Sequence, residues 1–399
     1  MRTKLLFILL LITQLTAQGQ DLPSLDSVKM LLTNPAIELE CTFGINNMYN
    51  NKFDVAESQF QWLRRKYPKH PLPNFLLGLS NWWRIMPNLD NKKYDIIFLA
   101  YMDSSIYYAK GMYKIDNSNI EAAFFLSAAY AFKARLYSER KMWRKAAVAG
   151  KRSLKYLEIC RDKDYLSPEL LFGDGIYNYY SVWIPENYPS LKPILLFFRK
   201  GDKQKGIEQL EEVRKEAFYT RVEAELFLMR IYALEENQNT KALYISQHLH
   251  KTFPNNPYFH RFYARMLYST GRYRSLKPVA EEILTRIDSG WVGYEEISGR
   301  YAAYYLAYLN DSRNGDQAKA VNYYKRTIEF AEKIESHSSG YYLLSLSALA
   351  RKAEKAKRYD EALEYYKKVL KHGNKKRSYY KKAKTFKKNY KKYKKGKAP

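Results

Sequence analysis

The 399-residue sequence is poor in the residues that mark several common classes of protein. It contains two cysteines, 17 glycines and 14 prolines. Two cysteines exclude a disulfide-stapled scaffold and a cysteine-based structural zinc site. The low glycine and proline content argues against collagen-like, linker-rich and turn-rich all-β chains. Acidic residues are also scarce, since 41 Asp and Glu against 68 Lys and Arg give a net charge of +27.

The residues that are abundant indicate a large, basic, helix-prone globular protein. Apolar residues make up 46% of the chain and aromatic residues 16%, including 38 tyrosines. This content excludes a wholly disordered chain, because enough apolar surface is available to offset the entropy of ordering. At about 150 residues per domain, the length allows two or three domains or one long solenoid.

The N-terminus has the pattern of a secretory signal peptide. Arg2 and Lys4 precede an apolar run at residues 5–12, and residues 17–19 fit the small-x-small cleavage motif. We therefore expect residues 1–19 to be removed and the protein to be exported to the periplasm or envelope of a bacterium. The run is too short to span a membrane, and no cysteine follows it, so we expect neither a transmembrane helix nor a lipoprotein anchor.

Export changes the expected partners of a basic chain. An exported protein rarely meets nucleic acid, so nucleic-acid binding is unlikely. Anionic envelope polymers, phospholipid head groups and acidic proteins are the expected partners. An oxidising compartment would also allow Cys41 and Cys160 to pair, but both occupy helix-facing positions. We favour two buried free thiols, and the sequence leaves the disulfide open.

Helical punctuation recurs along the chain. The segments 66–71 and 252–257 each contain two prolines that end one helix and start the next. Small residues also recur in the second helix of each predicted pair, where they allow close approach to the first helix. Spaced 34 to 60 residues apart, these positions are Ala56, Ser104, Ala146, Gly206, Ala242, Ala320 and Ala362, with Leu276 as the exception.

These residues resemble the tetratricopeptide repeat (TPR) family, whose unit is a pair of helices. The resemblance covers residues 38–371, although the third and fourth units match poorly. It implies an all-α, TPR-like α-solenoid over residues 20–371, with about eight antiparallel helix pairs forming a right-handed superhelix. It also implies a non-catalytic, protein-binding role. The best-matching positions are Phe43-Gly44, Phe53, Ala56, Phe60 and Pro68, then Gly271, Tyr273, Ala280 and Ile283, then Tyr359, Ala362, Tyr366 and Val369.

The middle of the chain carries a second, weaker resemblance. Residues 171–207 are similar to the middle segment of the tetratricopeptide 39 and inclusion-clearance proteins of eukaryotes, through glycine, proline and apolar positions. This supports an inserted apolar, proline-containing element at residues 182–200 and implies no activity. The insertion either packs against the solenoid or contacts a partner or membrane surface, and both alternatives stay open.

The sequence lacks the motifs of catalysis and of metal binding. It has no phosphate-binding Gly-x-x-x-x-Gly-Lys loop, no Gly-x-Ser-x-Gly elbow and no His-Glu-x-x-His pair. His248 and His250 point to different sides of a helix, although His260 could approach His250 at a helix junction. We therefore expect no enzyme activity, no cofactor and no metal site.

The TPR resemblance implies a concave groove lined by the first helix of each pair. The register places tyrosine and arginine there, which are common at binding hot spots. We expect this groove to bind an extended acidic or aromatic peptide. The alternative is that the tyrosines pack between neighbouring helices. The residues selected are Tyr258, Arg261, Arg265 and Tyr268 in the sixth unit, Tyr305 in the seventh and Arg351 in the eighth.

Residues 372–399 form a basic tail rich in lysine and tyrosine, with no acidic residue. Aromatic residues alternate with the lysines, so the tail could form a cationic helix that binds an anionic membrane surface or envelope polymer. A tail that only aids solubility is the alternative. The basic residues selected are Lys375, Lys376, Arg377, Lys381, Lys382, Lys387 and Lys388.

The sequence thus predicts an exported, non-catalytic scaffold or adaptor of the bacterial envelope. The alternative is a ligand-binding or enzyme-accessory protein for envelope polymers or nutrients, with its pocket in the irregular third and fourth units. An enclosed pocket with converging polar groups would favour this alternative, and an open groove would favour the scaffold.

Overall fold

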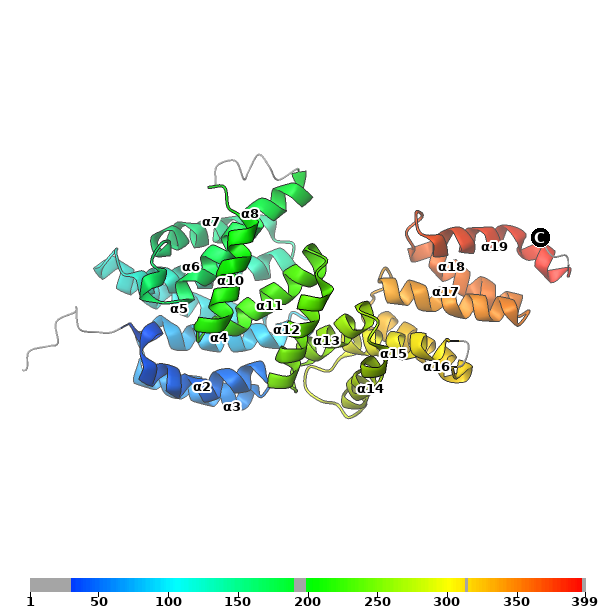
Figure 1. Ribbon diagram of the computed structural model, residues 1–399, viewed down its shortest axis with the longest axis horizontal. Helices are drawn as coiled ribbons and strands as arrows, with labels where there is room; N and C mark the ends of the chain where they lie inside the picture. The colour runs from blue at the N-terminus through cyan, green and yellow to red at the C-terminus, as the bar shows by residue number, and fades with distance from the viewer. Residues whose placement is uncertain (1–29, 190–198, 313–314, 397–399) are drawn as a thin grey trace, which may run out of the picture.

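The computed structural model describes residues 30–189, 199–312 and 315–396, and these ranges fold into helices without a strand. The expected signal peptide and residues 190–198 of the expected insertion lie outside the described residues. Figure 1 shows the helices following one another in antiparallel pairs, and each helix packs on the next. The predicted all-α solenoid is therefore confirmed.

Within the described ranges, eight helix pairs are followed by one further helix. The pairs are α2 (Pro35–Tyr49) with α3 (Phe53–Lys66), α4 (Pro71–Ile85) with α5 (Asp95–Ile115), α6 (Ile120–Glu139) with α7 (Trp143–Cys160), α8 (Glu169–Asn187) with α10 (Lys203–Glu216), α11 (Arg221–Arg230) with α12 (Asn239–Thr252), α13 (Pro257–Ser269) with α14 (Tyr273–Asp288), α15 (Glu296–Asn310) with α16 (Gln317–Lys333), and α17 (Gly340–Lys355) with α18 (Tyr359–His372). The last helix is α19 (Ser378–Lys394), and a π-helical turn, Ile231–Glu235, extends α11.

Proline and a capping side chain start several of the first helices. Asn34, His70 and Asn256 each accept a hydrogen bond from a backbone N–H of the first turn, and a proline follows each of them at the first helical position. The proline needs no N–H partner there, and its fixed φ suits a helix. The helix boundaries at residues 66–71 and 252–257 accordingly lie where the sequence predicts them.

Small residues allow the two helices of a pair to approach closely. Ala56, Ala242 and Ala362 are completely buried. At Gly206 an added Cβ would lie 2.6 Å from the backbone N of Tyr179 and 2.8 Å from the carbonyl O of Gly175. The α8 and α10 backbones therefore touch at this glycine, within the unit that matches the repeat poorly.

The first six pairs close into a complete turn. The Asn256 side-chain amide donates to the Tyr49 carbonyl O at 2.7 Å, and the Asn255 backbone N–H donates to Asn50 Oδ1 at 2.9 Å. The side chain of Asn51 also donates to the Val292 carbonyl O at 2.8 Å. These bonds join the end of α2 to the α12–α13 and α14–α15 connections, more than 200 residues away.

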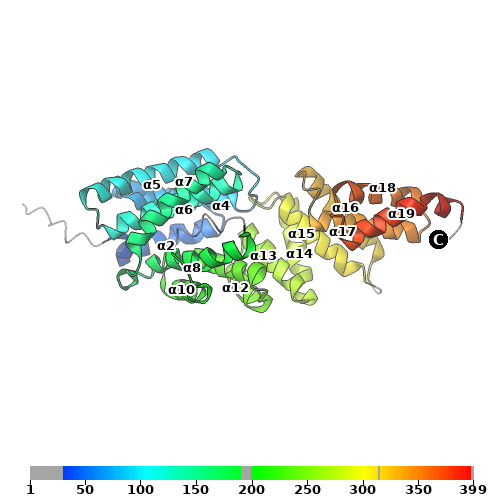
Figure 2. The same cartoon turned by 90° about the horizontal axis from the view of Figure 1, so that it is seen from above.

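The last pairs extend from this closed turn as an arm. Figure 2 shows α4 to α7 on one side, α8 to α12 on the other side, and α15 to α19 projecting beyond them. At the far end, α19 packs on α18, with the ring centroid of buried Phe386 4.8 Å from that of Tyr366. Helix α19 therefore covers the apolar end of the last pair, as a capping element does in repeat proteins.

Candidate binding sites

The predicted groove tyrosines pack between neighbouring first helices. The ring of Tyr268, on α13, stacks on that of Tyr305, on α15, at a centroid distance of 4.7 Å. The Tyr305 hydroxyl lies 3.1 Å from that of Tyr341, on α17. Tyr305 is fully buried, and Tyr258 is also buried. These tyrosines therefore join α13, α15 and α17, which is the alternative that the sequence left open.

The three predicted groove arginines have different environments. The Arg261 guanidinium donates to the carbonyl O of Pro87 at 3.1 Å and to Ser298 Oγ at 2.8 Å, so it joins α13 to the closed turn. Arg265 is half-buried beside the Phe262 ring, and Arg351 is exposed, 3.3 Å from Ser347 Oγ. Neither Arg265 nor Arg351 has a carboxylate within 4.0 Å among the residues described.

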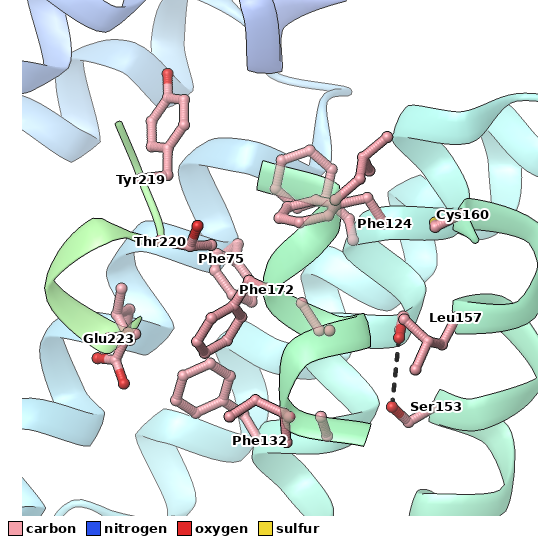
Figure 3. A pocket seen from close by; sticks show the side chains of 18 of the residues that line it. Phe75, Phe124, Phe132, Ser153, Leu157, Cys160, Phe172, Tyr219, Thr220 and Glu223 are labelled. Atoms are coloured by element: carbon pink, nitrogen blue, oxygen red, sulfur yellow. Dashed lines mark hydrogen bonds between the residues drawn. The ribbon is translucent and has the colours of Figure 1, made fainter. Parts of the chain in front are cut away.

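A partly open cavity of about 430 Å³ lies inside the closed turn. Its walls come from the first helices α2, α4, α6, α8 and α11, with further side chains from α7. Figure 3 shows the rings of Phe75, Phe132 and Phe172 facing this space, with Glu223 at one side and Ser153 at another. The cavity therefore lies largely in the third and fourth units, where the ligand-binding alternative placed its pocket.

Sequence reasoning did not select Arg135 and Glu223, which are the charged residues that line this cavity, or Arg230, which lies on the same helix as Glu223. Each lies among apolar residues of a first helix, with Phe132 one turn before Arg135 and Phe227 one turn before Arg230. A charged residue on the apolar side of such a helix is the signal that could have identified them.

The predicted basic residues of the tail all lie on its solvent side. Lys375, Lys376 and Arg377 precede α19 and are exposed. On the helix itself, the exposed face carries the remaining residues of the predicted set, namely Lys381, Lys382, Lys387 and Lys388. The opposite face holds Ala383 and Phe386, which are buried against the last pair. Helix α19 thus has one cationic face and one packed face.

Two histidines and a glutamate meet where α12 is followed by α13. The His250 and His260 rings stack at 4.3 Å, and the ligand atoms of His250, His260 and Glu282 lie within 4.8 Å of one another. The two rings are nearly parallel, so their nitrogen atoms lie side by side. Glu282 Oε1 is already paired with Arg286 Nη2 at 2.5 Å. Burial lowers the pKa of His250 to about 4 and that of His260 well below its usual range. The two rings are therefore neutral at pH 7, and the absence of a metal site stays a prediction.

Cys41 and Cys160 are free and buried. Burial raises the pKa of each thiol to about 12. The thiolate is the reactive form of cysteine, so neither residue is suited to nucleophilic or redox chemistry.

The comparisons with known proteins add little. No family model matches the chain, and no curated protein matches it. Among solved structures, the TPR domain of P58(IPK) is 14% identical, over 90% of this chain and 99% of that chain, with a TM-score of 0.24. The all-α fold therefore rests on the observed helix pairs. Within the described ranges, none of the helices has the length and apolar character needed to cross a membrane.

The buried histidines predict a loss of stability in acid. Above pH 6.5, His250 is neutral in both the folded and the unfolded state and its titration does not affect stability. As the pH falls from 6.5 to 4, the unfolded state binds this proton first, so the free energy of unfolding falls. Over this interval we expect the free energy of unfolding of the wild type to fall by about 3 kcal/mol more than that of His250→Gln. This figure follows from the lowered pKa of His250, about 4, at about 1.36 kcal/mol per pKa unit.

Urea unfolding at several pH values measures this difference. His248→Gln is the control, because it removes a histidine of the same helix whose side chain is 55% exposed. Equal acid sensitivity of the wild type and His250→Gln would contradict the account of a buried neutral ring.

Proposed function

We propose that this chain is an exported, non-catalytic scaffold or adaptor of the bacterial envelope that binds a protein partner along α13 and the α15–α19 arm that follows the closed turn. Export rests on the sequence of residues 1–19. The all-α solenoid supports a binding role, because stacked helix pairs present an extended concave surface to partners. The observation that carries the proposal is that Arg265 on α13 and Arg351 on α17 have no ion pair among the described residues.

The chemistry of this surface favours an acidic peptide segment. A carboxylate of a partner can form charge-assisted hydrogen bonds with each guanidinium, in planar, bidentate geometry. Partly exposed Tyr308 and Leu344, on α15 and α17, offer apolar contact area beside them. The strongly positive chain would also attract an acidic partner over distance at low salt.

Replacing both arginines tests this surface. We expect Arg265→Gln with Arg351→Gln to weaken capture of the specific partner from solubilised envelope by about tenfold or more, because hot-spot arginines contribute most of the binding energy. Quantitative pull-down followed by mass spectrometry measures the effect. The matched control, Arg64→Gln with Arg274→Gln, removes the same charge from exposed positions on the second helices α3 and α14. A partner held equally by all three proteins would contradict the proposal.

We also propose that the exposed face of α19 attaches the protein to anionic membrane surfaces or envelope polymers. Each basic residue near such a surface contributes roughly 1 kcal/mol before salt screening. Deleting the tail would be a poor test, because it would also remove Phe386 from its contact with Tyr366. Substitution of exposed lysines leaves this packing intact.

We expect Lys387→Gln, Lys388→Gln and Lys391→Gln together to reduce affinity for phosphatidylglycerol vesicles by about 100-fold at low salt, with an unchanged melting temperature. Vesicle co-sedimentation measures this affinity. The control set is Lys251→Gln, Lys277→Gln and Lys325→Gln, three exposed lysines on other helices. Equal losses in both triple variants would show that net charge alone, and not α19, determines the attachment.

The apolar cavity favours a second candidate function, the binding of an apolar ligand. Its volume of about 430 Å³ is within the usual range for small-molecule sites, about 300–1,000 Å³. The cavity and the arm lie in different halves of the chain, so a ligand-binding role and a scaffold role are compatible.

A further inference from the structure

The interior cavity combines an apolar body with a charged edge. Phe75, on α4, packs its ring 5.8 Å from that of Phe132, on α6, and Phe172, on α8, lies 5.9 Å from Phe227, on α11. All four side chains line the cavity, as do leucines and isoleucines of the same helices. A wall of this composition binds hydrocarbon or aromatic groups, which gain roughly 0.8 kcal/mol per buried CH₂ group.

One guanidinium group lies at the wall of this apolar space. Arg135 lines the cavity and lies over the rings of Trp82 and Phe227, at 4.6 and 5.4 Å from their centroids. Its one hydrogen-bond acceptor among the described residues is the Met86 sulfur, at 3.6 Å. Three residues after Phe227 on α11, Arg230 donates to the Tyr258 hydroxyl at 3.5 Å. Burial and repulsion by Arg230 lower the pKa of Arg135, whereas attraction to Glu223 raises it.

Three other poorly exposed arginines of this chain are paired with carboxylates, whereas Arg261 and Arg300 donate to carbonyl or hydroxyl oxygens instead. Arg84 pairs with Glu57 at 3.2 Å, Arg140 with Asp95 at 2.6 Å and Arg161 with Asp174 at 3.2 Å. Neither Arg135 nor Arg230 has a described carboxylate within 4.0 Å. A buried cation without an anion is costly, and an incoming anion would remove that cost.

The carboxylates nearest to these arginines already have hydrogen-bond donors. Glu223 Oε1 accepts from Trp83 Nε1 at 2.9 Å and from the Tyr49 hydroxyl at 3.5 Å. Glu235 Oε1 accepts from the Tyr180 hydroxyl at 3.1 Å. Burial raises the pKa of both glutamates, while attraction to Arg135 lowers that of Glu223 and attraction to Arg230 lowers that of Glu235. Neither glutamate lies within 4.0 Å of these arginines, so the Arg135 guanidinium keeps donors for an anion, although Glu223 Oε2 also lacks a partner among the described residues.

We propose that the cavity binds a single-headed amphipathic anion, namely a fatty acid of medium chain length, with its alkyl chain among the phenylalanines and its carboxylate against Arg135. The proposal rests on the second candidate function above, since it names the ligand class of the same cavity. The alkyl chain of a fatty acid would fill the apolar space, and its carboxylate would pair with the Arg135 guanidinium. A neutral lipid of equal length would fill the space and leave that guanidinium unpaired.

Calorimetric titration of the full chain with dodecanoate and with dodecanol tests the proposal. The two probes share their alkyl chain and differ in the charge of the head group. We expect dodecanoate to bind about 10- to 100-fold more tightly than dodecanol to the wild type, the range for loss of a charge-assisted hydrogen bond. In Arg135→Met, which keeps an apolar stem of similar length, we expect this preference to disappear while dodecanol binds as before.

Two further variants separate the ways in which the proposal can fail. Ala131→Trp places a large side chain on the cavity wall and should abolish binding of both probes. Arg274→Met, on the exposed side of α14, should leave the binding of both probes unchanged.

Equal binding of both probes to the wild type would overturn the anion site and leave the apolar pocket standing. Failure of both probes to bind the wild type would overturn the pocket itself, and unchanged dodecanol binding to Arg135→Met shows that this variant is folded.

Discussion

The buried hydrogen bond from the Asn256 amide to the Tyr49 carbonyl marks the contact on which the rest of this structure depends. In most solenoids each repeat touches only its neighbours, and the coil stays open. In this chain the end of α2 meets the start of α13, so six helix pairs close into one turn. Arg261 strengthens the closure by reaching the Pro87 carbonyl from α13. Closure converts the concave surface of these pairs from an open groove into a partly open cavity.

Closure also divides the molecule into two parts with different binding chemistry. Within the closed turn, the first helices face one another across an apolar space whose wall includes Arg135. Beyond it, α15 to α19 form an arm whose first helices are joined by tyrosines and carry exposed cations (Figure 1). One repeat sequence thus provides a site for a small ligand and a surface for a macromolecule, because one part of the solenoid closes and the other does not.

The local features of this fold could be predicted from the sequence, and the closure could not. Pro71 and Pro257 determine where helices begin through their own backbone geometry, so a single residue type predicts a boundary. Closure depends on the summed rotation of six pairs, and no residue encodes it. The same difference separates the sites. The exposed lysines of α19 follow from a local pattern, whereas Arg135 and Arg230 become neighbours only after α6 and α11 meet across the cavity. The role of Tyr305 stayed open because a tyrosine at its position suits either a groove or a helix contact.

Formation of an engineered disulfide across the closure tests the central claim most directly. The Asn255 backbone N lies 2.9 Å from Asn50 Oδ1, so the two residues are neighbours across the closure. The two native cysteines are buried and their thiols have a high pKa, so they do not compete for disulfide formation. In Asn50→Cys with Asn255→Cys, the account predicts an intramolecular disulfide on mild oxidation, seen as a faster-migrating monomer on a non-reducing gel and as a mass loss of two hydrogens. Two free thiols, or disulfide-linked dimers only, would show that the turn is open in solution and would contradict the account.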